Sequence, residues 1–199
     1  MKFQKQNSWF SIIEVMIAIF IFAMTMASIF MVINSTLSTN NLNKNQIIAS
    51  NLAREQIEII RNLRDNNYAT FHKWNYIPNS SNDYSKVLDY DKYYKVENDL
   101  SDPIYTFKIK EISSFAEWKN ELKWKMQNYR LYLDSDNNYT YNSSWTWTIF
   151  YRYLHTEKLK DENWNIIPEA MKITSKVIWY SKWYHQFEIK TILADFNRL

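Results

Sequence analysis

The chain has 199 residues, no cysteine and a formal net charge of +3. This length accommodates one membrane segment and one domain of ordinary size, and the lack of cysteine excludes disulfides and thiolate metal sites. The weak charge excludes the broad basic field that drives nucleic-acid binding, so we expect no nucleic-acid partner.

Glycine is absent from the chain, whereas tryptophan occurs nine times. At average usage of about 7%, roughly 14 glycines would be expected. Three stretches with the composition of turns carry tryptophan where glycine is usual, namely SSWTWT at 143–148, DENWN at 161–165 and SKWYH at 181–185. We hypothesise that some tryptophans are UGA codons that the source organism reads as glycine. The alternative is a genuinely glycine-free protein, and Trp179 in the apolar run KVIWY fits a genuine tryptophan in either case.

The N-terminal part divides into a basic segment, residues 1–9, and an apolar segment, residues 10–33, whose single charge is Glu14. The apolar segment is long enough to cross a hydrocarbon core of about 30 Å as a helix, and it exceeds the apolar region of a secretory signal peptide. Lys2 and Lys5 precede it, and no further basic residue occurs before Lys44. This bias predicts a single-pass protein with a cytoplasmic N-terminus.

Residues 34–65 predict an amphipathic continuation of the same helix. Ile48, Leu52, Ile59 and Leu63 fall near one face, and the polar run that starts at Arg64 predicts the end of the helix. The half of the helix outside the membrane therefore requires a partner for one apolar stripe.

Residues 66–199 predict a β-rich globular domain outside the cytoplasm. Its first part, residues 66–103, has the composition of a long irregular connection. Strand-like runs follow at 104–112, 128–134, 148–159, 171–180 and 184–196, and the last two read as a hairpin joined through SKW. The predicted fold is α+β, with the outer half of the helix packed on an antiparallel sheet of roughly four strands.

Candidate binding residues are few. Asp134, Asp136 and Asn138 alternate as at the start of a calcium loop, but the position expected to hold its glutamate is Trp145, and a hairpin turn is the alternative interpretation. The histidines show no metal-ligand spacing, and no nucleophile or phosphate-loop motif occurs, so we expect neither an enzyme nor a cofactor.

The junction SWFSIIEVMIAIFIFA at residues 8–23 resembles the N-terminal signature of the type IV pilin and type II secretion pseudopilin family. The family pattern is a basic leader, glycine, phenylalanine and, four residues later, glutamate in an apolar helix. Trp9 stands at the glycine position, where a bulky side chain would block cleavage; a recoded glycine would remove this departure. The overall layout, including NLAREQIEIIRNLRDNNY at 51–68 and the final hairpin, is also similar to minor pilins.

The resemblance implies that a prepilin peptidase and methyltransferase cleaves between Trp9 and Phe10 and methylates Phe10. Glu14 would then pair with the terminal amine of a neighbouring subunit and set the register of the helices in a filament. The implied partners are the peptidase, other pilin subunits and an inner-membrane assembly platform. The implied location is the bacterial inner membrane, followed by a cell-surface or periplasmic filament.

Three functions remain open from the sequence. The first is a minor pilin of a type IV pilus, and the second is a pseudopilin of a secretion system; neighbouring genes would separate these two. The third is a signal-anchored membrane protein with an outer surface-binding domain. That third function predicts an uncleaved N-terminus and leaves Glu14 without a role.

Overall fold

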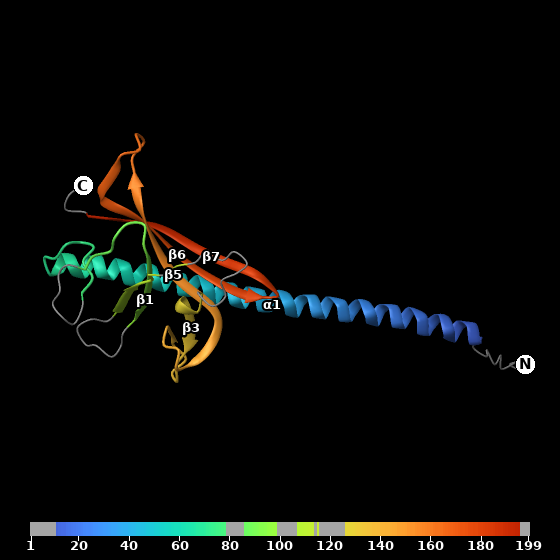
Figure 1. The fold of residues 1–199 in the computed structure, drawn as a ribbon. Coiled ribbons are helices and arrows are strands. Elements are labelled where there is room, and N and C mark those ends of the chain that lie inside the picture. The colour runs from blue at the N-terminus through green and yellow to red at the C-terminus, as the bar shows by residue number, and fades with distance from the viewer. Residues whose placement is uncertain (1–10, 79–85, 99–106, 114, 116–125, 196–199) are drawn as a thin grey trace, which may run out of the picture. The chain divides into compact units, whose positions relative to one another are not determined.

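The computed structural model describes residues 11–78, 86–98, 107–113, 115 and 126–195. It combines one long N-terminal helix with a curled antiparallel sheet, which confirms the predicted α+β class (Figure 1). The chain divides into two compact units, residues 1–44 and 45–199.

Helix α1 spans Ile12–Ala69. Its predicted apolar stripe is confirmed: Leu52, Ile59 and Leu63 are buried, and Ile48 is partly buried. The helix continues beyond the expected end at Arg64 and finishes in a Schellman motif, in which Phe71 N–H donates to the Tyr68 carbonyl and His72 N–H donates to the Asn67 carbonyl. The polar run therefore extends the helix by about one turn before it ends.

Seven strands form the sheet within the described residues, so the expectation of roughly four strands was too low. They are β1 (Tyr93–Asn98), β2 (Phe107–Glu111), β3 (Arg130–Leu133), β4 (Tyr139–Thr140), β5 (Thr146–Lys160), β6 (Ile166–Ser181) and β7 (Trp183–Ala194), with a short 3-10 helix, η1 (Gln127–Tyr129), before β3. Strand β1 lies in the segment predicted to be irregular, where its tyrosines and charged residues gave a weak strand pattern. Residues 104–106 of one predicted run lie outside the described residues.

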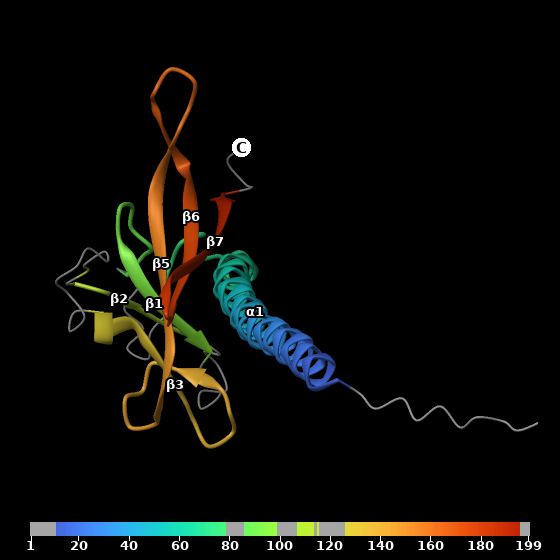
Figure 2. The same ribbon diagram turned by 90° about the vertical axis from the view of Figure 1, so that its right-hand side faces the viewer.

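Strand β5 lies at the centre of the sheet and pairs with β1, β3 and β6 (Figure 2). One of its edges pairs with β6 over most of its length, and β6 pairs in turn with β7 through the predicted hairpin. The other edge is shared by β1, opposite Leu154 and His155, and by β3, opposite residues 146–151. This arrangement lets two short strands extend the sheet from one long strand.

Two clusters of buried side chains join the outer part of α1 to the sheet. The first places Ile60 and Leu63 against Leu154, Met171 and Ile173. The second contains Ala49, Leu52, Ala53, Leu131, Phe150, Val177 and Trp179. A third cluster includes Tyr129, Tyr153 and Phe115: the Tyr153 ring meets the other two edge-to-face, and the Phe115 and Tyr129 rings are stacked. The domain core is therefore built largely from helix-to-sheet contacts.

Candidate membrane segment, polar core and cavity

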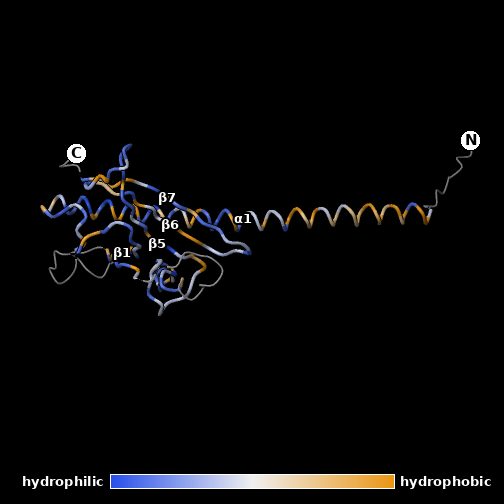
Figure 3. Tube along the Cα trace, turned by 45° about the horizontal axis from the view of Figure 1, so that its top comes forward, coloured by the Kyte–Doolittle hydropathy of each residue, from blue (hydrophilic) through white to orange (hydrophobic). Residues whose placement is uncertain are grey.

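Helix α1, whose N-terminal part belongs to the first unit, is the one helix among the described residues that is long and apolar enough to cross a membrane. Its apolar side chains are exposed in the isolated chain, including Phe20 at 64% and Phe30 at 63%. Figure 3 shows hydrophobic residues following one another along this part of α1, whereas its outer part mixes both kinds. Such a surface requires lipid or other apolar helices around it.

Hydroxyl groups in this segment are bonded within the helix itself. Thr25 Oγ1 donates to the Phe22 carbonyl at 2.8 Å, and Ser28 Oγ donates to the Met24 carbonyl at 2.9 Å. A hydroxyl satisfied in this way avoids the cost of an unpaired polar group in hydrocarbon. These residues are therefore compatible with a lipid environment despite being polar.

Glu14 lies in the first turn of α1 and is exposed. The N–H groups of Glu14 and Val15 both donate to the Ser11 carbonyl, at 2.9 and 3.2 Å, so Ser11 precedes the helix as its cap. An acidic side chain in the first turn also interacts favourably with the helix dipole. Trp9 and Phe10, the predicted cleavage site, lie outside the described residues.

The three calcium candidates form a hairpin turn. Asp134 Oδ1 accepts the N–H groups of Asp136 and Asn138 at 2.9 and 2.7 Å, and Asp134 Oδ2 accepts the Asn138 side-chain amide at 3.2 Å. Hydrogen bonds from Asn138 hold the pKa of Asp134 below its ordinary value. The hydrogen bonds of the turn occupy Asp134 and Asn138, and no group of three histidine, aspartate or glutamate residues that could hold a metal ion occurs among the described residues.

Sequence reasoning missed a buried arginine of strand β5 whose side chain contacts α1. Arg152 is completely buried, and its Nη1 atom lies 2.7 Å from Oε2 of Glu55, whose side chain is 32% exposed. Arg152 also donates to the carbonyls of Leu52 at 3.3 Å and Val96 at 2.9 Å. One guanidinium thus connects α1, β1 and β5.

Three further polar residues complete this network. Tyr141 Oη donates to the Arg152 carbonyl at 2.8 Å, and Gln56 Nε2 donates to Tyr141 Oη at 3.3 Å. Ser175 Oγ donates to Gln56 Oε1 at 2.7 Å. Burial raises the pKa of Tyr141, which keeps the phenol neutral and able to donate. We call Glu55, Gln56, Tyr141, Arg152 and Ser175 the polar core.

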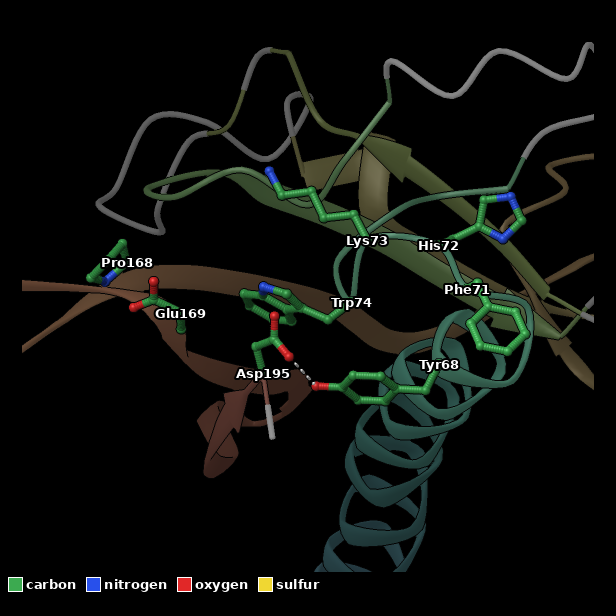
Figure 4. Close-up of a pocket in the computed structure, with 8 residues that line it drawn as sticks. All are labelled: Tyr68, Phe71, His72, Lys73, Trp74, Pro168, Glu169 and Asp195. Atoms are coloured by element: carbon green, nitrogen blue, oxygen red, sulfur yellow. Dashed lines mark hydrogen bonds between the residues drawn. The ribbon is translucent and has the colours of Figure 1, made fainter. Parts of the chain in front are cut away.

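A cavity of about 540 Å³ lies beside the end of α1 (Figure 4). Its lining combines aromatic and charged residues, among them Trp74, Lys73 and Glu169. Tyr68 Oη donates to Asp195 Oδ1 at 2.8 Å across one side. Because the lining carries both signs of charge, its chemistry favours no single class of ligand.

The comparisons with known proteins give no relative. No family model, curated protein or solved structure matches the chain. Function must therefore be argued from the residues themselves.

Proposed function

We propose that this protein is a filament subunit of the type IV pilin kind, most simply a minor pilin. One observation carries the proposal: Glu14 is the single charged residue of the apolar segment and lies exposed in the first turn of its helix. A carboxylate within a membrane helix costs about 2.5–3.5 kcal/mol at the bilayer centre and less near an interface, so a partner for Glu14 is favourable. A neighbouring subunit's terminal amine would supply that partner.

The exposed apolar helix supports the same proposal. Its side chains would face lipid before assembly and the helices of other subunits afterwards, without any change in the folded domain. Processing by a prepilin peptidase, methylation of Phe10 and handling by an inner-membrane platform belong to this proposal. A pseudopilin of a secretion system uses the same features, and a simple membrane anchor is the alternative that leaves Glu14 without a role.

The substitution Glu14→Ala tests assembly separately from insertion. We expect the variant to enter the membrane normally, but its amount in sheared filaments to fall about tenfold or more. Each 1.4 kcal/mol of pairing free energy that is lost lowers the equilibrium by a factor of ten. The measurement is quantitative immunoblotting of membrane and filament fractions, with the full chain and its own assembly genes. Thr25→Ala is the matched control, because its hydroxyl bonds only to its own helix.

Normal filament content of Glu14→Ala would contradict the assembly role and favour the membrane anchor. Loss of both variants from filaments would assign the effect to helix packing rather than to the carboxylate.

A further inference from the structure

Two hairpin turns of the sheet have the same geometry. The first, residues 134–138, joins β3 to β4, and the second, residues 161–165, joins β5 to β6. In each turn the first N–H donates to the fifth carbonyl, at 3.1 Å for Asp134 and 2.9 Å for Asp161. The fourth N–H donates to the first carbonyl at 3.2 and 3.1 Å respectively. The two backbones are therefore closed by equivalent bonds.

The side chains of the two turns repeat the same bonds as well. Asp161 Oδ1 accepts the N–H groups of Asn163 and Asn165 at 2.9 and 2.8 Å, and Asp161 Oδ2 accepts the Asn165 side-chain amide at 3.1 Å. These bonds match those of Asp134 with the third and fifth residues of its own turn. Hydrogen bonds, first among them the Asn165 amide, likewise hold the pKa of Asp161 below its ordinary value.

The turns differ at the fourth residue, which adopts the left-handed conformation in both. This residue is Asn137 with φ of 63° in the first turn and Trp164 with φ of 66° in the second. Glycine and asparagine adopt this region readily, whereas a bulky residue with a β-carbon is strained there by roughly 1–2 kcal/mol. Position 164 thus has the geometry of a glycine or asparagine site.

Burial of the Trp164 side chain does not offset the backbone strain, because the side chain is exposed. It is 78% exposed, and its ring lies 5.1 Å from Lys160 Nζ, a cation–π contact that is weak at an exposed site. Trp179 is the opposite case, because it lies in the interior of β6, is only 4% exposed and packs near Phe150 and His185. A glycine at 179 would leave a large void in the core.

We infer that residue 164 is natively glycine, translated from a UGA codon, and that residue 179 is a true tryptophan. The turn geometry thereby distinguishes individual positions among the nine tryptophans. The inference does not depend on the proposed pilin function.

Thermal unfolding of the full chain in detergent micelles, followed by circular dichroism, tests the conformational argument. We expect Trp164→Gly and Trp164→Asn to raise Tm by about 2–4 °C, and Trp164→Ala to raise it less, since alanine retains a β-carbon. Trp179→Gly is the contrasting variant and is expected to lower Tm. An equal rise for alanine and glycine, or no rise for glycine, would overturn the assignment of position 164.

Protein taken from the source organism tests the assignment directly. The mass of the peptide that contains residues 161–165 is expected to correspond to glycine at 164, and the mass of the peptide around 179 to tryptophan. Codons 164 and 179 are expected to be UGA and UGG. Tryptophan at 164 in the native peptide would overturn the inference while leaving the test of Glu14 in filaments unaffected.

Discussion

At the scale of single residues, Arg152 shows how one buried charge can join three elements. The alternation along β5 places it on the same buried face as Phe150 and Leu154, so the sequence pattern already marks it as an inward charge. Its partner Glu55 lies on the helix, far away in the sequence, and no spacing rule connects the two. The polar core could therefore be suspected, but not assembled, from the sequence.

Removing the guanidinium is expected to destabilise the domain strongly. Arg152→Ala would remove the guanidinium bonds to Glu55 and to the Leu52 and Val96 carbonyls and would open a void in the core, at a cost of about 2–5 kcal/mol, although Glu55 Oε1 would still accept from Asn98. Urea denaturation of the full chain in micelles measures this free energy of unfolding. Arg61→Ala is the control, since its pair with Glu58 is exposed at 46% and 60%, and it is expected to cost below about 1 kcal/mol. Equal costs for the two variants would contradict the role given to Arg152.

The buried phenol of Tyr94 makes the free energy of unfolding depend on pH in alkaline solution. Its side chain is 2% exposed, and burial raises the pKa of its phenol to about 12, although the bond from Asp89 N–H opposes the shift. Because the folded pKa exceeds the unfolded value of about 10, the stabilisation is complete below pH 10 and is lost as pH rises towards 12. We expect Tyr94→Phe to reduce the slope of unfolding free energy against pH in this window. An unchanged slope would contradict the assignment.

At the scale of elements, periodicity predicted the long elements well. The stripe on α1 and the hairpin of β6 and β7 both follow from spacing alone, because each buries one face along many residues. Short strands were harder to predict, because β1 is rich in tyrosine and charged residues and β4 has only two residues. Such strands are held by pairing with β5 and β3, which a local pattern does not contain.

The turns illustrate the same limit at a finer level. Asp and Asn in 134–138 fitted both a calcium loop and a hairpin, and the carboxylate bonds within the turn favour the hairpin. The composition of DENWN at 161–165 already indicated a turn, but Trp164 at its fourth position hid the equivalence with 134–138. Only the shared φ values and hydrogen bonds reveal that the two turns are equivalent.

At the scale of the whole molecule, the two parts of α1 differ in their side chains and in what covers them. Residues 12–33 are largely apolar and exposed throughout, whereas residues from Ala49 onwards build the domain core. Glu14 interacts favourably with the dipole of its own helix, a contribution of about 0.3–1 kcal/mol, but its carboxylate forms no ion pair with another described residue. A subunit that is first held in a membrane and then packed by its helix would use both features.

The most direct test of this account is the mass of the N-terminal peptide of the native protein. We predict a peptide that begins at N-methylated Phe10, because the proposed pilin processing removes residues 1–9 and modifies the new terminus. An intact N-terminus that begins at Met1 and carries tryptophan at position 9 would contradict the account and leave the protein as a simple membrane anchor.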